Sequence, residues 1–354
     1  MPNTYQWRPE QGIFNIKPYP IAFPKDQIKN REATMWRYKE ALPFQDSEVY
    51  SSITLGEGLT PLVRLDHREP NILVKMDYLM PTGSFKDRGA AVLIAKAKEM
   101  GVSTVVADSS GNAGTSIAGY CARAKIGCHI YVPESTSERK LSQIKAHGAE
   151  VHKISGTREE TAQAAKEAVE SKGLFYASHV YNPFFYEGTK TFAFEIWEQL
   201  NFTVPDSLIL PVGNGTLLLG AFIGFKNLKD AGVISKLPRI IGVQAEPCAP
   251  ITRAYHCQAR MEPITNIGTQ AEGIAIANPA RGEQVLSAIK ETNGTIITAP
   301  EANIESARRE LAQKGFYVEP TTAATYAAYK EHQSKVVKEN EVVIMSLCGS
   351  GLKK

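Results

Sequence analysis

Short apolar runs along this chain alternate with longer stretches in which apolar residues recur at helical spacing. Short runs bounded by turn residues predict strands, and the longer periodic stretches predict helices. A first series places strands at 104–107, 128–132, 150–154 and 174–177, and helices at 115–124, 138–147 and 159–171. Repeated strand and helix units with apolar strands indicate a parallel sheet covered by helices on both faces. Ser135 and Glu138 have the spacing of a capping box at the start of the second helix.

A second series of the same kind follows a long helix predicted at 187–200. It places strands at 207–212, 239–244, 294–298 and 342–347, and helices after Gly215, at 302–314 and at 321–331. A chain of 354 residues exceeds the size at which single cores stop growing. We therefore predict an α/β fold with two doubly wound lobes and a cleft between them. The expected division is an N-terminal arm at 1–57, a smaller lobe at 80–185, and a larger lobe made of 58–79 and 186–354.

Charge and composition argue against several classes of partner. The chain has 40 basic and 37 acidic residues, a net charge of +3, and no basic run dense enough to follow a phosphate backbone. Its longest apolar run, 208–225, is interrupted by proline and glycine, which argues against a membrane span. The first residues are polar and do not resemble a secretory signal. We therefore expect a cytoplasmic protein that binds neither nucleic acid nor membrane.

The five cysteines are odd in number and contain no Cys-x-x-Cys pair, which is typical of reduced cytosolic cysteines. Cys248, His256 and Cys257 come nearest to a metal-binding pattern, but no fourth ligand has suitable spacing. We therefore predict no structural metal.

The stretch from Pro81 to Ala90 contains the residue with the most distinctive chemistry, Lys86. It follows a turn that includes Gly83 and precedes an alanine-rich apolar run, which predicts a helix start with Ser84 as its hydroxyl cap. The helix dipole and partial desolvation favour a neutral, nucleophilic amine at this position. Such an amine suits Schiff-base chemistry. Taken alone, the pattern also fits solvated charges in the first turn of a helix.

Small, polar loops follow three of the predicted strands, where ligands of open α/β sheets collect. Ser-Ser-Gly-Asn at 109–112 leads into a helix start, where amides can bind a carboxylate and Asn112 can donate to a phenolate. Gly-Asn-Gly-Thr at 213–216 fits a monophosphate, because it lacks the P-loop and dinucleotide patterns. Cys348 begins a glycine-rich loop after the last strand and is suited to face a ring nitrogen. An ordinary helix cap or tight turn would explain either of the first two loops if it stood alone.

Together these segments resemble the fold type II pyridoxal-phosphate enzymes, and within them the threonine synthase branch. The matching segments are Gly-Glu-Gly-Leu-Thr-Pro-Leu at 56–62, Pro-Thr-Gly-Ser-Phe-Lys-Asp-Arg-Gly at 81–89, Ser-Ser-Gly-Asn at 109–112, Asn-Pro at 182–183, Pro-Val-Gly-Asn-Gly at 211–215, Val-Glu-Pro at 318–320 and Gly-Ser-Gly-Leu-Lys at 349–353. The resemblance implies a tryptophan synthase β-like fold with pyridoxal 5'-phosphate between the lobes. It also implies a small amino acid as substrate, which loses or exchanges a substituent at its β or γ carbon.

The resemblance also assigns roles to residues of this sequence. Lys86 would be the catalytic residue and would bond covalently to the cofactor, Asn112 would bond the ring oxygen, and Cys348 would face the pyridine nitrogen. The implied cofactor-binding residues are Phe85, Lys86, Asn112, Gly213, Asn214, Gly215, Thr216 and Cys348. The implied substrate-binding residues are Ser84, Ser109, Ser110, Gly111 and Phe185.

Four positions depart from the family pattern. Cys348 stands where many members have threonine, and Thr216 and Leu217 stand where the family often has a further glycine and an asparagine. Phe185 stands where threonine synthases commonly have an arginine that binds the substrate phosphate. Because a dianionic ester needs charge-assisted partners, this change predicts poor use of O-phosphohomoserine, the default substrate, for threonine synthesis.

The alternatives are a serine or threonine dehydratase, a β-replacement synthase acting on another substrate, and a non-catalytic pyridoxal-phosphate-binding protein. A homodimer is left open.

Overall fold

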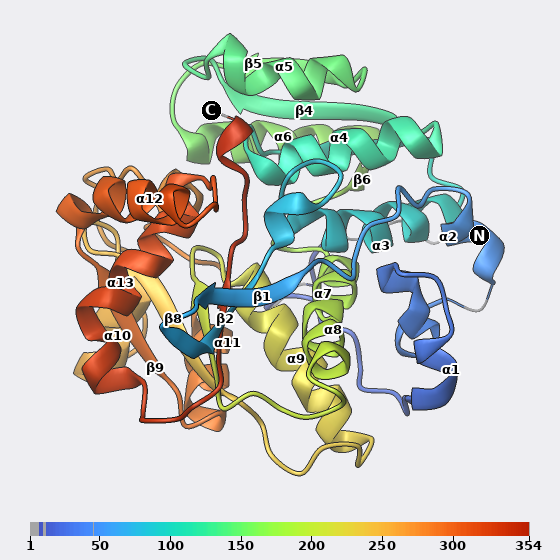
Figure 1. The fold of residues 1–354 in the computed structure, drawn as a ribbon. Helices are drawn as coiled ribbons and strands as arrows, with labels where there is room; N and C mark the ends of the chain where they lie inside the picture. Colours follow the sequence, from blue (N-terminus) through green and yellow to red (C-terminus); the bar gives the residue numbers. More distant parts are fainter. Residues whose placement is uncertain (1–6, 10–11, 45, 354) are drawn as a thin grey trace.

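The computed structural model describes residues 7–9, 12–44 and 46–353, and its strands form two sheets (Figure 1). The four-stranded sheet has the order β5-β4-β3-β6, and all of its pairings are parallel. Its strands are β3 (Thr104–Ala107), β4 (Gly127–Pro133), β5 (Glu150–Ile154) and β6 (Phe175–Tyr176). They all come from the segment 80–185 that was expected to form the smaller lobe.

The six-stranded sheet has the order β1-β2-β10-β7-β8-β9. Its strands are β1 (Leu62–Asp66), β2 (Glu69–Lys75), β7 (Ser207–Pro211), β8 (Arg239–Ala245), β9 (Thr295–Ala299) and β10 (Val343–Ser346). Only the β1–β2 pairing is antiparallel among these strands. Every residue of β7 and β10 is buried, as expected for parallel strands that are covered on both faces.

Helices connect the strands and cover both sheets (Figure 1). The α-helices are α1 (Lys25–Lys29), α2 (Ser47–Ser51), α3 (Lys86–Glu99), α4 (Asn112–Ala124), α5 (Glu138–Ala146), α6 (Arg158–Lys172), α7 (Pro183–Thr189), α8 (Thr191–Gln199), α9 (Thr216–Asp230), α10 (Pro250–Cys257), α11 (Gly282–Glu291), α12 (Ile304–Gln313) and α13 (Pro320–Val336). This architecture of two sheets with intervening helices confirms the predicted α/β class.

Two local predictions were wrong. The helix predicted at 187–200 begins earlier, at Pro183, because the Asn182 side chain caps the Phe184 amide and proline suits the first helical position. It also divides into α7 and α8 at Lys190. The capping box predicted for α5 does not form, since the residue before that helix is Ser137 and its side chain makes no cap bond. A capping box forms instead at the start of α6.

The N-terminal arm packs on the body of the protein through buried aromatic residues. Within the arm, the Trp36 indole donates to the Glu57 carboxylate at 2.6 Å, and the Tyr38 hydroxyl donates to Glu198 of the body at 2.5 Å. Among the residues that the structure describes, no helix is both long and apolar enough to cross a membrane.

Candidate active site

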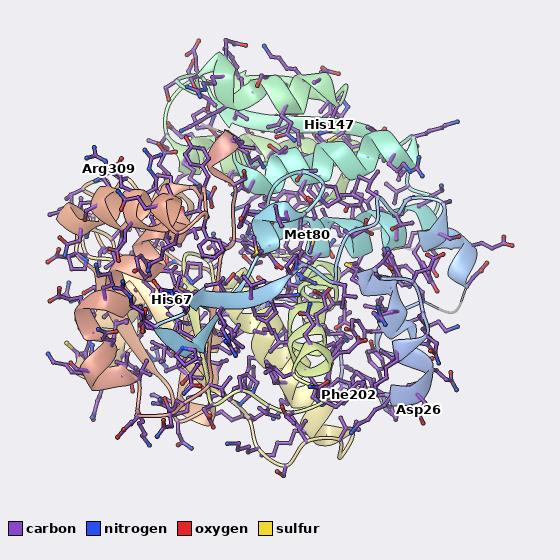
Figure 2. The ribbon with its side chains drawn as sticks, in the orientation of Figure 1. Asp26, His67, Met80, His147, Phe202 and Arg309 are labelled. Carbon is purple, nitrogen blue, oxygen red and sulfur yellow. The ribbon has the colours of Figure 1, made fainter. Side chains whose placement is uncertain are left out.

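A cleft of about 790 Å³ opens where the loops after β3, β7 and β10 and the start of α3 come together. Met80, labelled in Figure 2, lies on its wall between the upper and lower parts of the molecule. Most of these loops follow the carboxyl ends of parallel strands, which is where α/β folds place their ligands. The cleft is therefore the candidate active site.

Lys86 is the first residue of α3 and lines the cleft. Its Nζ donates to the Thr216 hydroxyl at 2.9 Å and lies 4.8 Å from the Phe85 ring centroid and 5.6 Å from that of Phe185. The pKa of Lys86 is lowered from 10.5 to about 7, mainly by desolvation in these surroundings; the charge of Arg158 adds to the decrease, and Cys348 and Glu319 oppose it. A large fraction of this amine is therefore neutral near pH 7, as a nucleophile or base requires.

The turn before Lys86 is closed by Asp87, and the predicted Ser84 cap is wrong. The Asp87 carboxylate accepts from the Thr82 amide at 2.7 Å and also from the hydroxyls of Thr82 and Ser116. Ser84 is buried, its hydroxyl has no hydrogen-bond partner in the part of the chain that is described, and it does not line the cleft. The side chain that fixes the turn thus comes from inside the helix.

The loop from Gly213 to Thr216 forms a cradle at the start of α9. Gly215 has φ +81°, and a Cβ there would lie 2.3 Å from a methyl carbon of Val285, so the position requires glycine. In the described structure the amides of Gly213, Asn214, Gly215 and Thr216 donate to no carbonyl or side chain. Free amides at the N-terminus of a 15-residue helix fit a phosphate group.

The Ser-Ser-Gly-Asn loop forms another wall of the cleft and leads into α4. The helix starts at Asn112, three residues earlier than predicted. A Cβ on Gly114 would lie 1.8 Å from the Ser109 carbonyl oxygen, so a glycine allows the helix to meet the loop closely. Ser109, Ser110 and Gly111 all face the cleft, at a position suited to a carboxylate.

Cys348 and Glu319 lie together on the wall formed by the C-terminal loop. The Cys348 sulfur is 3.1 Å from the Thr322 hydroxyl and 3.9 Å from a Glu319 oxygen, and burial raises the pKa of its thiol so that it stays neutral. Glu319 also accepts from the Asn112 amide at 2.9 Å. A Cβ on Gly349 would lie 2.3 Å from the Glu319 carboxylate carbon, which explains the glycine.

Glu319 is a site residue that was not predicted from the sequence, although it belongs to the matching Val-Glu-Pro segment. The glutamate directly precedes Pro320, which starts α13, and this helix entry points it into the cleft. A glutamate inside a matched segment and directly before a proline that can start a helix is the signal that the sequence contained.

Phe185, predicted to bind substrate, does not line the cleft. It is fully buried beneath Lys86, where its ring fills the space left by Gly89, since a Cβ on that glycine would lie 2.3 Å from the ring. The aromatic side chain is therefore part of the floor beneath the site, and a direct substrate contact is not supported.

Arg88, Lys190 and His179 are the basic residues that we considered from the sequence as replacements for the arginine missing at position 185. Arg88 and Lys190 are buried in ion pairs, Arg88 with Asp77 and Glu195, and Lys190 with Glu187. His179 lines the cleft, together with three cationic residues that the sequence analysis did not identify: Arg139, Arg158 and Lys353. Lys140 also faces the cleft, but it pairs with Glu272 at 2.6 Å.

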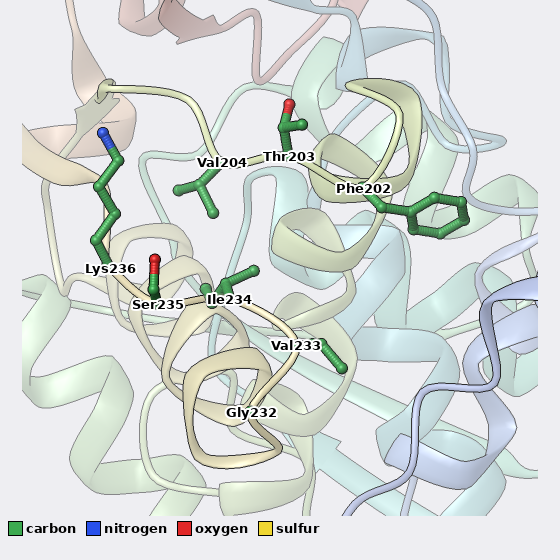
Figure 3. Close-up of a pocket in the computed structure, with 8 residues that line it drawn as sticks. All are labelled: Phe202, Thr203, Val204, Gly232, Val233, Ile234, Ser235 and Lys236. Carbon is green, nitrogen blue, oxygen red and sulfur yellow. The ribbon is translucent and has the colours of Figure 1, made fainter.

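A second, more open pocket lies on the loops that follow α8 and α9 (Figure 3). Its walls come from Phe202 to Val204 and Gly232 to Lys236, and the Phe202 ring points away from the other labelled side chains. Lys236, the charged residue there, pairs with Asp206 at 3.0 Å. This pocket brings together none of the predicted site residues.

Comparisons with known proteins agree with this geometry. The family model described as "Pyridoxal-phosphate dependent enzyme" matches residues 53–349. A threonine synthase of Methanocaldococcus jannaschii is 36% identical over 93% of this chain and 83% of its own length. A threonine synthase of Halalkalibacterium halodurans is 36% identical over 90% of each chain.

Solved structures share the fold. Maize serine racemase superposes with a TM-score of 0.74 at 19% identity, covering 86% of this chain and 92% of its own. A threonine deaminase from Solanum lycopersicum gives a TM-score of 0.73 at 24% identity, covering 97% and 90%. The predicted fold type II architecture and its cofactor are thus confirmed, and the chain belongs to the pyridoxal-phosphate-dependent enzymes as a lyase of the threonine synthase-like branch.

Proposed function

We propose that this enzyme acts on an amino acid with an anionic substituent at its β or γ carbon, and that O-phosphohomoserine, the substrate for threonine synthesis, is the leading candidate. The observation that carries the proposal is the group of cations that line the same cleft as Lys86, namely Arg139, Arg158 and Lys353. A charged leaving group in a partly desolvated site needs such partners.

The residues around Lys86 suit proton transfer at the α-carbon of an amino acid. When bound, pyridoxal phosphate supplies an electron sink for the charge that develops there. With a pKa of about 7, the Lys86 amine takes up a proton near neutral pH and gives it back at low cost. The Thr216 hydroxyl, 2.9 Å from Nζ, orients this amine.

The loops around the cleft would hold cofactor and substrate. The amides at 213–216 would bind the cofactor phosphate, and Asn112 would donate to the ring oxygen once its present bond to Glu319 is exchanged. Cys348, a neutral thiol, would face the ring nitrogen without charging it. The loop at 109–111 would bind the substrate carboxylate.

Arg158 and His179 are the proposed contacts for the substituent. The His179 ring lies 6.0 Å from the Phe185 ring, which lies 5.6 Å from the Lys86 amine. Burial, with the charges of Lys86 and Arg158, lowers the pKa of His179 well below its usual value. A neutral imidazole and a guanidinium together offer hydrogen bonds and charge to a phosphate. Asp108 also lies there, but burial raises the pKa of its carboxyl group and the Tyr176 hydroxyl donates to it at 2.9 Å.

A second candidate is a dehydratase or β-replacement enzyme that acts on a smaller, uncharged substrate. Phe185 favours it, because this residue stands where the resemblance leads us to expect the phosphate-binding arginine. A purely cofactor-binding role is disfavoured, since binding alone does not require the activated amine of Lys86.

Steady-state kinetics on a substrate panel test the proposal. The panel contains O-phosphohomoserine, serine, threonine, and the O-phospho and O-acetyl forms of the last two. We expect the highest kcat/KM for a phosphorylated substrate, and a loss of about tenfold or more in Arg158→Gln because a charge-assisted contact is removed. Arg309→Gln, at an exposed position far from the cleft (Figure 2), is the matched control. Equal or better turnover of serine or threonine, unchanged in Arg158→Gln, would establish the second candidate instead.

We also infer a cytoplasmic location. A homodimer is the oligomeric state that light scattering should test. Free cysteines support the location: Cys121, Cys128, Cys248 and Cys348 are buried and unbridged, and Cys257 is exposed.

A further inference from the structure

Three side chains of metal-ligand type lie together on the four-stranded sheet, outside the cleft. His129 is on β4, and Glu150 and His152 are on the neighbouring strand β5, where His129 stands opposite Glu150 in the parallel register. His129 and Glu150 lie in the amino-terminal halves of their strands and His152 is the middle residue of β5, whereas the cleft is at the carboxyl ends. The active site uses none of these residues.

The ligand atoms of the three residues converge. His129 Nδ1 lies 2.9 Å from His152 Nε2, and each of these nitrogens faces a different Glu150 oxygen, at 3.4 Å for His129 and 3.3 Å for His152. Around a tetrahedral zinc ion with bonds of about 2.0 Å, neighbouring ligand atoms are about 3.3 Å apart. The observed separations therefore match a shared ion after shifts of a few tenths of an ångström.

We propose that His129, His152 and Glu150 form a binding site for a divalent transition-metal ion of the zinc class, with solvent completing the coordination. Two imidazoles and one carboxylate form a donor set that binds such ions in preference to magnesium or calcium. The imidazoles are about 30% exposed and the carboxylate is 65% exposed, so an ion can enter from solvent.

Metal binding requires a neutral imidazole with a free lone pair on each of the two facing nitrogens. Tyr131 stacks on the His152 ring with centroids 4.6 Å apart and fixes its orientation.

A competing explanation is that the two histidines only hydrogen-bond to each other, with Glu150 as an acceptor. That arrangement fills the same space, but it needs an N–H on one of the two facing nitrogens. Metal binding replaces this proton with the ion, by a change of tautomer in one ring. The site is distinct from Cys248, His256 and Cys257, which were considered from the sequence alone.

Binding of the ion should join two strands of the sheet. β5 is an edge strand, held by β4 on one side, and a ligand set from both strands links the edge to the sheet interior. The unfolded chain has no preformed site, so the ion should bind the folded chain preferentially. Its binding should therefore raise the midpoint temperature of thermal unfolding.

Titration with Co²⁺ followed by visible absorbance, and competition by Zn²⁺, tests the proposal on the cofactor-loaded enzyme. All variants carry Cys257→Ser, which removes the exposed thiol as another ligand. We expect one Co²⁺ per chain, at least tenfold weaker binding in His152→Ala and His129→Ala, and no change in His67→Ala. His67 is a matched control because it is 85% exposed and pairs with Asp66 outside the cluster.

Glu150→Gln changes an exposed side chain without changing its shape. It is the alternative test variant if a histidine variant fails to fold. It should also weaken Co²⁺ binding severalfold and remove the rise in thermal midpoint caused by Zn²⁺. Equal affinity and stoichiometry in the parent, His152→Ala and Glu150→Gln proteins would overturn the proposal. These readouts do not use turnover, so they are independent of the substrate assignment.

Discussion

The Lys86 amine and the Thr216 hydroxyl are 2.9 Å apart and join the start of α3 to the start of α9. α3 leads into β3 of the four-stranded sheet, whereas α9 follows β7 of the six-stranded sheet, so this contact links both sides of the cleft at the reacting group. It also places a hydrogen-bond partner beside the residue whose pKa is most important for the chemistry.

Replacing Thr216 with valine removes this partner without changing the size of the side chain. A single hydrogen bond contributes about 0.5–1.5 kcal/mol net, so we expect kcat/KM to fall about two- to tenfold. Thr216→Ser keeps the hydroxyl and should retain nearly full activity. Equal activity of the valine and serine variants would mean that the hydroxyl does not orient Lys86.

The lowered pKa of Lys86 predicts a specific pH dependence for capture of the cofactor by the cofactor-free protein. Only the neutral amine reacts, so the rate should rise as pH increases through about 7 and level off above about 8. An ordinary lysine with a pKa of 10.5 would keep accelerating beyond pH 9. Stopped-flow absorbance measures the rate, and pyridoxal serves as a control because it has no phosphate to titrate. A rate that continues to rise steeply to pH 9 contradicts the prediction.

A buried network of four charges lies directly behind Lys86. Arg88 bonds Asp77 and Glu195, and the Lys75 amine lies 2.7 Å from Glu195, with all four side chains fully buried. Glu195→Gln leaves two cations facing one carboxylate, so we expect a loss of about 3–5 kcal/mol in the free energy of unfolding. Glu291→Gln breaks the exposed pair with Lys226 and should cost less than about 1 kcal/mol. Urea denaturation of both variants makes the comparison.

The same network predicts a stability change at acid pH. Its cations lower the pKa of Glu195 from 4.5 to about 2, although burial alone would raise it. A carboxyl group with a depressed pKa adds stability above its unfolded pKa, and this is lost as pH falls from about 4.5 towards 2. Glu195→Gln should therefore reduce the slope of stability against pH in this window. An unchanged slope would show that other carboxylates determine the pH dependence of stability in this window.

Phe185→Arg is not expected to restore a phosphate-binding arginine. The ring is fully buried against Gly89 and 5.6 Å from the Lys86 amine, so a guanidinium there would be buried beside a like charge. We expect a loss of several kcal/mol in stability and no gain with O-phosphohomoserine. Phe184→Arg, at a partly exposed neighbour, should be milder in its effect on stability. A stable Phe185→Arg enzyme with improved kcat/KM for O-phosphohomoserine would show that position 185 reaches the substrate.

Local signals in the sequence located much of the site. Three predicted parts of the site line the cleft: Lys86, the loop at 213–216 and Cys348. Each follows a turn or a strand whose residue types are informative without knowledge of the rest of the chain. The Ser84 prediction failed because Asp87, inside the helix, closes the same turn more effectively. Local sequence therefore located the turn but not the hydrogen bonds that hold it.

The cations around the cleft could not be found from the sequence. Arg139 and Arg158 lie on helices that follow β4 and β5, and they reach the cleft of Lys86 because the strand order places β4 beside β3 and β5 beside β4. The metal-ligand cluster has the same origin, since the parallel register of β4 and β5 brings His129 to Glu150. Strand order and register are long-range properties that residue types at one position do not encode.

The central place of β10 in the larger sheet has a consequence for the growing chain on the ribosome. All strands of the four-stranded sheet lie between residues 104 and 176, so this sheet can form early in translation. β2, at 69–75, must wait for its parallel neighbour at 343–346, and until then one of its edges is open to wrong partners. The nascent chain therefore carries Lys86 long before Cys348 and Glu319 arrive beside it. The cofactor site is assembled only when β10 enters the sheet, which ties its completion to a late stage of synthesis.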